Sequence, residues 1–384
     1  MFDVAVAKCK SYEYSECRSA LEEVLSKTDG INKITFGKKV VIKVNLVSAM
    51  KPEKAATTHP VLLCALIDIL REKGADIIVG DSPGGIYNAA HLNHVYSVTG
   101  MRSAEEHGAK LNDDFSEAKA EFPQAKTAKE FYYTAYLDKA DYIIDFCKLK
   151  THGMMGMSAG VKNMFGVVPG IVKPEYHYKY PNVADFASMI VDLNEYFKPI
   201  LTICDAITGM EGNGPTAGTP RDIGAVMASD SPYKLDTVCA KLIGLTKDDI
   251  PILEEAFNRG YTTATADELN IYGETDSLVI RDYKKLPVNK SHAFESDSDN
   301  VFGRLIGKLI KIFLEARPKV RKNECVGCKE CFRVCPAKAI TMQNDKPVID
   351  RKKCIKCFCC QEFCPKGAMK VNRTIIAKIF SKDK

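Results

Sequence analysis

Two copies of one cysteine pattern constrain this chain more than any other feature. The pattern Cys-x2-Cys-x2-Cys-x3-Cys-Pro begins at Cys325 and again at Cys354, 29 residues later. Three closely spaced thiolates can wrap one corner of a cubane cluster, and the fourth, after its three-residue spacer, points toward the other cluster. The spacing therefore predicts two [4Fe–4S] clusters with crossed ligands. The first cluster would take Cys325, Cys328, Cys331 and Cys364, and the second would take Cys354, Cys357, Cys360 and Cys335.

Zinc and disulfides are the alternatives for so many cysteines. Structural zinc sites favour two separated Cys-x2-Cys pairs rather than three cysteines in one run. A disulfide framework needs an oxidising compartment, and the start, MFDVAVAKCK, lacks the basic and apolar regions of a secretory signal. Cys359 lies between two predicted ligands. We expect it to pack beside the cluster, and replacement of Cys360 as a ligand is the alternative.

Charge and cysteine content both change near residue 300. Nine of the 15 cysteines lie between Cys325 and Cys364. Residues 301–384 hold 21 Lys+Arg and 7 Asp+Glu, a net of +14; because the whole chain holds 54 and 49, residues 1–300 hold 33 and 42, a net of −9. We therefore expect an acidic body over residues 1–300 and a basic two-cluster tail over residues 321–384.

The body alternates between strand and helix patterns. Residues 39–47, KVVIKVNLV, are β-branched and largely apolar, as in a strand buried on both faces. His59-Pro60 then opens an apolar-periodic helix that continues to Leu70. This alternation predicts an α/β domain with a mostly parallel sheet. Further strands are expected over 75–81, 140–146, 200–207 and 224–229, and helices over 183–196, 232–242 and 250–258.

Residues 301–320 predict an amphipathic, basic linker helix. Apolar side chains from Phe302 to Phe313 fall on one helical stripe, lysine and arginine side chains fall on another, and Pro318 ends the pattern. Such a stripe usually packs on the protein itself; the alternative is a helix that docks on a membrane surface or a partner. No apolar run approaches the ~20 residues that span a bilayer, which excludes a transmembrane protein.

Four stretches of the body are dense in polar side chains, and most of them follow predicted strands. In the first, Lys43 and Asn45 share one face of a strand, and a buried lysine is costly unless it is paired. The second, GDSPGG around Asp81, matches no nucleotide fingerprint. The fourth contains Asp205 and Asn213. Ligands of open α/β sheets lie beyond the carboxyl ends of the strands, so we expect a site here.

The third stretch is cationic throughout. It contains no Asp or Glu from Lys148 to Pro174, and it is rich in Gly and Met. A solvated basic loop is the simple interpretation, but uncompensated cations among small residues suit a carboxylate or phosphate ligand. We expect its side chains to converge with Lys43 and Asp205 on one anion-binding pocket. The candidates are Lys150, His152, Lys162, Asn163 and His177.

Together these stretches resemble domain of unknown function 362, a family of bacterial and archaeal iron–sulfur proteins. The resemblance covers about residues 1–290 and implies a cytoplasmic protein without a settled activity. Residues 320–372 resemble bacterial-type two-cluster ferredoxins, which implies a small α+β domain. A remote similarity to the lactate racemase fold would place catalytic Lys and His near strand ends, but no motif carries individual residues across. The family match rests on IKVNLV (42–47), TTHP (57–60), GDSPGG (80–85), Lys150–His152, KNMFG (162–166), and Asp205 with GNGP (212–215).

These features predict an iron–sulfur oxidoreductase that takes part in electron transport. We expect it to work under anaerobic conditions. Electrons would pass through both clusters to or from an anionic small molecule in the body. His152 and His177 are the best proton donors, because histidine titrates near neutrality. Catalytic roles fall to His152, His177 and Lys150. Substrate binding falls to Lys43, Asn45, Asp81, Lys162, Asn163, Asp205 and Asn213.

Two other functions stay open. The chain could be a ferredoxin-type electron carrier with a docking body, or a non-redox, isomerase-like enzyme with structural or sensory clusters. Cubane clusters deliver single electrons, whereas most organic reductions need two. A further cofactor in the body, such as a flavin or a metal, is therefore also possible, although no sequence motif indicates one. The expected partners are an electron donor or acceptor protein and an anionic small molecule. Nucleic acid is not expected.

Overall fold

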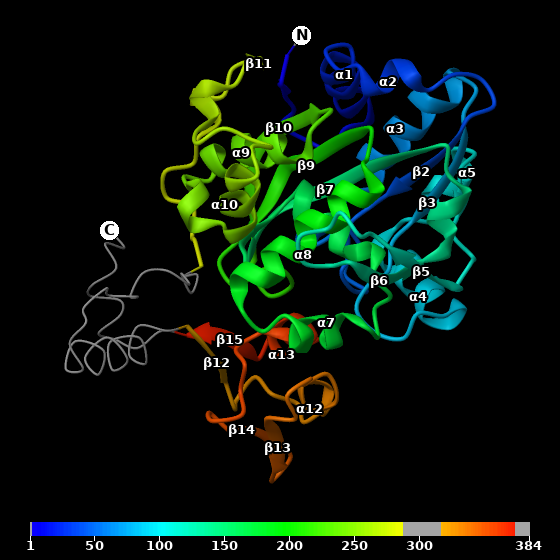
Figure 1. The fold of residues 1–384 in the computed structure, drawn as a ribbon. Helices are drawn as coiled ribbons and strands as arrows, with labels where there is room; N and C mark the ends of the chain where they lie inside the picture. Colours follow the sequence, from blue (N-terminus) through cyan, green and yellow to red (C-terminus); the bar gives the residue numbers. More distant parts are fainter. Residues whose placement is uncertain (1, 287–315, 373–384) are drawn as a thin grey trace.

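The body folds around one large mixed sheet. The structure, a computed structural model, describes residues 2–286 and 316–372. Within them the sheet strands are β1 Val4–Lys8, β2 Lys39–Lys43, β3 Asp76–Gly80, β4 Lys110–Leu111, β7 Tyr142–His152, β8 Gly156–Ser158, β9 Leu201–Glu211, β10 Thr219–Ser229 and β11 Ile271–Tyr272. Their order is β11-β1-β10-β9-β7-β2-β3-β4, with β8 paired to β7. Figure 1 labels β10, β9, β7, β2 and β3 in this order across the sheet.

The centre of this sheet is parallel. Strands β4, β3, β2, β7 and β9 run parallel to their neighbours, whereas β10 is antiparallel to β9 and β1 is antiparallel to β10. The predicted α/β body with a mostly parallel sheet is therefore confirmed. The carboxyl ends of β2, β3 and β7 consequently meet at one edge, which is the edge where α/β sheets hold ligands.

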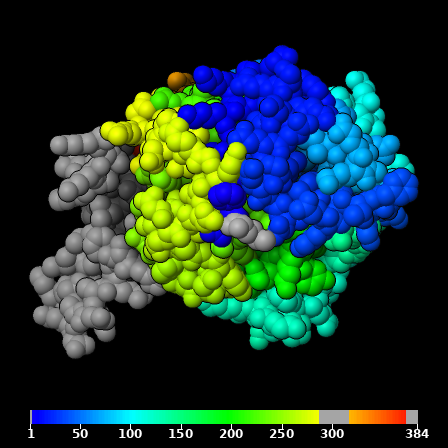
Figure 2. Space-filling view, turned by 90° about the horizontal axis from the view of Figure 1, so that it is seen from above, coloured from blue at the N-terminus to red at the C-terminus, as the bar shows by residue number. Residues whose placement is uncertain are grey.

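Helices cover both faces of the sheet because the strands are apolar on both faces. Val40 and Ile42 pack with α1 and α3, while Val41, between them, faces the core of α8, α9 and α10. Figure 2 shows the N-terminal segments, in blue, beside the segments around residue 250, in yellow. The helices are α1 Tyr14–Leu25, α2 Gly30–Lys33, α3 Pro60–Glu72, α4 Ala89–Thr99, α5 Ser103–Glu106, α6 Gly160–Asn163, α7 Lys173–Lys179, α8 Val183–Phe197, α9 Pro232–Leu242 and α10 Pro251–Asn258, and a hairpin of β5 Glu117–Glu121 and β6 Glu130–Thr134 lies outside the sheet.

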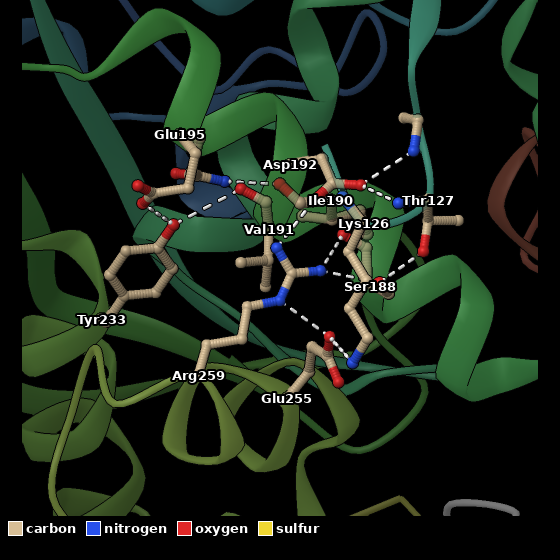
Figure 3. Close-up of polar contacts among 12 residues, drawn as sticks. Lys126, Thr127, Ser188, Ile190, Val191, Asp192, Glu195, Tyr233, Glu255 and Arg259 are labelled. Atoms are coloured by element: carbon tan, nitrogen blue, oxygen red, sulfur yellow. Dashed lines mark hydrogen bonds and ion pairs between the residues drawn. The ribbon is translucent and has the colours of Figure 1, made fainter. Parts of the chain in front are cut away.

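A buried carboxylate ties the outer helices together away from the sheet edge. Asp192 of α8 lies 2.6 Å from Nη1 of Arg259, just beyond α10, and accepts a hydrogen bond from the backbone N–H of Thr127 at 2.7 Å (Figure 3). Arg259 also pairs with Glu255 of α10 at 2.8 Å. The guanidinium and the backbone donors together compensate the buried charge of Asp192. This network is structural.

The strands of the site end at other positions than the sequence predicts. Strand β7 continues to His152 instead of ending near residue 146, and β9 continues to Glu211 instead of ending near residue 207. The two strands stay paired through a register shift between Lys148 and Lys150. The polar side chains of the third and fourth stretches therefore begin inside strands, not after them. Strand β2 instead stops early, at Lys43 rather than residue 47.

The tail contains two strand pairs and two short helices. Strand β12, Arg317–Val320, pairs with β15, Met369–Asn372, and β13, Ile340–Gln343, pairs with β14, Lys346–Ile349. Helices α12, Glu330–Arg333, and α13, Cys359–Glu362, each carry the third cysteine of one motif copy. The prediction of a linker helix over 301–320 is wrong for residues 316–320, of which 317–320 form β12; residues 301–315 lie outside the described residues.

Within the part of the chain that the structure describes, no helix has the length and apolarity needed to cross a membrane.

Candidate active site

The tail gathers its cysteines in two groups of four. One small cavity, the first-cluster site, is lined by Cys325, Cys328, Cys331 and Cys364, and another, the second-cluster site, by Cys335, Cys354, Cys357 and Cys360. Each group holds three thiols of one motif copy and the fourth thiol of the other copy. Four thiolates are the donor set that a [4Fe–4S] cluster takes, so the residues present fit two such clusters.

The backbone repeats its conformation between the two motif copies. Lys329 and Phe358, 29 positions apart, have φ of 64° and 61°, and each directly precedes the short helix of its copy. Gly327 and Lys356 form a second such pair, with φ of 74° and 59°. Left-handed residues turn the chain sharply. The thiols on either side of these turns consequently face one cavity.

Cys359 is buried at the second-cluster site. It is 1% exposed and lines the same cavity as Cys360. Both roles considered for it, packed neighbour and ligand, are compatible with this position.

The second motif copy docks the tail on the body. Nε2 of Gln361 donates hydrogen bonds to the carbonyls of Asn213 and Gly214, at 3.0 and 2.9 Å. The side chain of Asn213 in turn donates to the carbonyl of Met369 and accepts from the N–H of Val371. Phe358 is 2% exposed and packs into the body core. The side chain of Asn213, a predicted substrate-binding residue, thus bonds to the tail.

His152 links the body to the tail. Its Nδ1 accepts hydrogen bonds from the backbone N–H groups of Met154 and Met155, at 3.1 and 3.2 Å. The proton of the neutral ring therefore resides on Nε2, which lies 2.9 Å from a carboxylate oxygen of Glu362 in α13. Burial lowers the pKa of His152. With both ring nitrogens engaged, this side chain is better placed to position Glu362 than to donate protons to a substrate.

One large cavity lies between the body and the tail. Its volume is about 1420 Å³, above the roughly 300–1000 Å³ of ordinary ligand sites. The tail contributes Cys335 and Cys364, which belong to different cluster sites, together with Glu362 and Phe363. The body contributes eight residues predicted for the site: Lys43, Asn45, Asp81, Lys150, His152, Lys162, Asn163 and His177.

Lys43 organises the floor of this cavity. Its ammonium group lies 2.8 Å from each of three acceptors: the carbonyl of Val44, Oδ1 of Asn163 and Oδ1 of Asp81. Asn163 also accepts from Nδ2 of Asn45 at 2.8 Å. All three ammonium protons are thus used within the protein. This group is a rigid scaffold, in which a paired charge satisfies the requirement for burying lysine.

Lys150, which is buried, and Lys173, which is half-buried, have no anionic partner in direct contact among the described residues. Lys150 donates to Oδ1 of Asn45 and to the carbonyl of Ala56, at 2.5 and 2.7 Å, and Lys173 donates to the carbonyls of Ser82 and Val168. Burial lowers the pKa of each ammonium to about 7, because neutral acceptors do not repay the desolvation of a cation. Both amines can therefore exchange a proton near neutral pH.

Lys162 and His177 present polar groups to the cavity. Among the described residues, the ammonium of Lys162 contacts the ring of Phe165, 4.5 Å from its centroid, and has no hydrogen-bond acceptor. His177 is 2% exposed and stacks on Phe186 at 4.2 Å, and its Nδ1 has no partner there. Burial lowers the pKa of His177 to about 3. Buried polar groups normally have partners, so Nδ1 of His177 is open to a ligand; the ammonium of Lys162 faces the cavity with the carboxylate of Glu362 in its surroundings.

Asp205 lies apart from this cavity. Its carboxylate pairs with Lys148 at 2.9 Å and accepts a hydrogen bond from the hydroxyl of Tyr12 at 2.8 Å. The backbone N–H of His59 donates to the same carboxylate at 3.0 Å. The predicted convergence does not hold for Asp205, which does not line the cavity, because the register of the two strands sets Lys148 and not Lys150 opposite it.

Many residues of the cavity lie outside the predicted set, and three of them carry polar groups that the site uses: Lys173, Ser82 and Glu362. Lys173 belongs to the basic third stretch and Ser82 to GDSPGG, so each lay beside a sequence signal. Glu362 carried no signal of its own, because only the docking of the tail brings it to the cavity.

The sequence also matches known families. The model described as "Domain of unknown function (DUF362)" matches residues 40–241, more than half of the chain. The chain belongs to this family. All ten predicted substrate-binding and catalytic positions of this DUF362 chain lie within the matched range, but the description assigns no reaction to them. A model described as "4Fe-4S dicluster domain" matches residues 317–365, so this DUF362 protein carries two [4Fe–4S] clusters and transfers electrons.

Individual relatives extend these matches. Thylakoid-associated protein sll1697 of Synechocystis sp. is 28% identical over 288 residues, which are 73% of this DUF362 chain and 87% of the relative. The lactate racemase apoprotein from Thermoanaerobacterium thermosaccharolyticum aligns with a TM-score of 0.41 at 11% identity. That alignment covers 64% of this chain and 58% of that structure, so the chain spans less than two thirds of its length.

Proposed function

We propose that this protein is an iron–sulfur reductase whose anionic substrate binds in the cavity between body and tail. One observation carries the proposal: a single cavity is bordered by Lys150, Lys162 and His177 on the body and by Cys335 and Cys364, one thiol from each cluster site. When bound, the two clusters supply one electron each. A two-electron reduction of one substrate also consumes two protons.

The cavity lysines are suited to deliver those protons. A group transfers protons best when its pKa is close to the working pH, and burial lowers the pKa of Lys150 and Lys173 to about 7. Each ammonium could give one proton to the substrate and be reprotonated from water. Lys162 and His177 would hold the substrate anion, because the ammonium of Lys162 faces the cavity and Nδ1 of His177 lacks a partner among the described residues. Lys43 and Asp81 would keep this arrangement rigid.

The electron donor would be a protein that docks at the first-cluster site. Cys328 is exposed there, next to Val326 and Phe332, which are 61% and 49% exposed. Lys329 and Lys366 line the same site. The second-cluster site instead includes Phe358, which packs on the body. Electrons would then enter from the donor at the exposed first-cluster site and pass through the second-cluster site to the substrate in the cavity.

We place the protein in the cytoplasm. The name of Thylakoid-associated protein sll1697 makes attachment to a membrane face the alternative. Fractionation of cells into soluble and membrane material, with the full chain detected by antibody, distinguishes the two.

Reoxidation of the reduced clusters tests the function. Anaerobically prepared protein is reduced, freed of reductant and mixed with a panel of carboxylates and phosphate esters, while the visible absorption of the clusters is followed. We expect at least one compound to speed reoxidation more than tenfold, and Lys162→Met to abolish that effect. The control is Lys33→Met, an exposed lysine outside the cavity. If no compound is reduced while protein acceptors take electrons normally, the chain is an electron carrier.

A further inference from the structure

The mouth of the cavity exposes large apolar side chains. Ile86, Ile171 and Tyr178 line it and are 61%, 58% and 60% exposed. Exposed apolar residues are common singly, but a group of them around a cavity marks a binding surface. These three come from two different segments, the loop after β3 and the segment around α7.

Backbone packing fixes these segments against each other. A Cβ added to Gly170 would lie 2.1 Å from the carbonyl oxygen of Pro83 and 2.6 Å from that of Gly85. Only glycine permits such an approach. Ile171 directly follows Gly170 and Ile86 directly follows Gly85, so the close contact places both isoleucines on one rim. The apolar rim is therefore a built feature of the fold.

The buried part of the cavity holds a cation, Lys162, beside the neutral ring of His177 and the carboxylate of Glu362. Lys162 is 9% exposed and His177 is 2% exposed, and Nδ1 of His177 has no partner among the described residues. The cavity is thus segregated, with polar groups at its deep end and apolar side chains at its mouth. A small anion would satisfy the deep end and leave most of the 1420 Å³ unfilled.

We infer that the ligand is an amphipathic carboxylate, with its carboxylate at Lys162 and His177 and its apolar part against Ile86, Ile171 and Tyr178. This inference deepens the proposed function and rests on the cavity being its substrate site. Each methylene buried against the rim strengthens binding roughly fourfold. Affinity should consequently rise with chain length until the apolar part fills the mouth.

Binding to the oxidised protein tests this ligand class without requiring electron transfer. Calorimetric titration of the full, cluster-loaded chain compares acetate, octanoate and octanamide, each as free solute. We expect octanoate to bind at least tenfold more tightly than acetate, and also more tightly than octanamide, its uncharged counterpart. Lys162→Met should remove the preference for octanoate over octanamide, and Lys33→Met should keep it.

Variants of the rim test the apolar part. Tyr178→Ser and Ile171→Ser should each reduce octanoate affinity severalfold without changing acetate affinity. Phe36→Ser is the matched control, because Phe36 is 89% exposed and lies outside the cavity. Equal affinity for acetate and octanoate overturns the inference. So does Tyr178-dependent binding to phospholipid vesicles with no binding of free acids, which would make the rim a membrane contact. Tight octanoate binding without any reducible compound would refute the reductase while leaving the ligand class intact.

Discussion

At the scale of single residues, the body concentrates lysines where folding makes them costly. Lys43, Lys148 and Lys150 are each at most 1% exposed. Two of them are neutralised in direct contact, by Asp81 and Asp205 respectively. Lys150 has only neutral acceptors, so its charge is the one that the fold penalises. A protein keeps such a residue when its proton is useful.

This difference predicts that the stability of the protein depends on pH through Lys150. Its pKa falls from 10.5 to about 7 on folding, so between these values the unfolded chain holds a proton that the folded chain lacks. Stability therefore rises with pH across that window, and the penalty is fully present below pH 7. Relative to Lys150→Met, the wild type should gain roughly 2 kcal/mol between pH 7 and pH 9. Burial is the main cause; the charged groups that also act on Lys150 are Asp81, Lys162, Lys148 and Lys43.

Thermal unfolding of the anaerobic, cluster-loaded proteins at several pH values measures this gain. The variant also leaves two acceptors unsatisfied, so it should be less stable at every pH, and only the change in the difference is informative. Lys33→Met, at an exposed position, should show a constant difference from wild type. A constant difference for Lys150→Met as well would mean that Lys150 stays charged when folded.

At the scale of elements, a segment of the body around Asn213 contributes several of the hydrogen bonds that dock the tail. The backbone carbonyl and side chain of Asn213 bond to Gln361, Met369 and Val371. The site cavity exists only while α13 and β15 stay in this position.

Replacement of Asn213 by Ala should therefore loosen the tail. It removes two side-chain hydrogen bonds worth about 1 kcal/mol each, and the fraction of undocked molecules should rise roughly tenfold or more. Hydrogen exchange of the amides of α13 and β15 in the cluster-loaded protein would accelerate by a similar factor. Gln343→Ala, on the exposed strand β13, is the control. Unchanged exchange at Val371 would show that the remaining contacts, among them the packing of Phe358, hold the tail without the side chain of Asn213.

The elements also show where sequence reasoning stops. Alternation of apolar residues located β2, β3, α3, α8 and α9 within a few residues, because burial on a known face dictates that pattern. The ends of β7 and β9 were placed too early, because β7 ends in the mostly polar run KLKTH and β9 contains Gly209 near its end, and pairing within the sheet keeps both extended. The body's side of the site follows from the strand ends. The tail's side, with Glu362 and Phe363, follows from docking of the tail, which no local sequence pattern predicts.

At the scale of the whole molecule, charge is divided between the ends of the electron path. The described tail, residues 316–372, holds 14 Lys+Arg and 5 Asp+Glu, a net of +9, whereas residues 1–300 hold a net of −9. This division was readable from the sequence, as were the two clusters. Which surface carries the charge was not, because it depends on which side of the tail the body covers.

The exposed side is the first-cluster site, and a basic surface there should attract an acidic electron donor. Charge complementarity raises association rates by roughly 10- to 1000-fold at low salt, and salt screens it within about 10 Å at 0.1 M. With a reduced acidic flavodoxin as donor, cluster reduction should slow about tenfold between low and high salt. The double variant Lys329→Glu, Lys366→Glu should slow it comparably at low salt, while an uncharged reduced dye should act equally on both proteins. Lys33→Glu, Lys39→Glu changes the net charge by the same amount on the body and should retain the wild-type rate. Equal slowing by both double variants would show that net charge alone, and not the first-cluster surface, guides the donor.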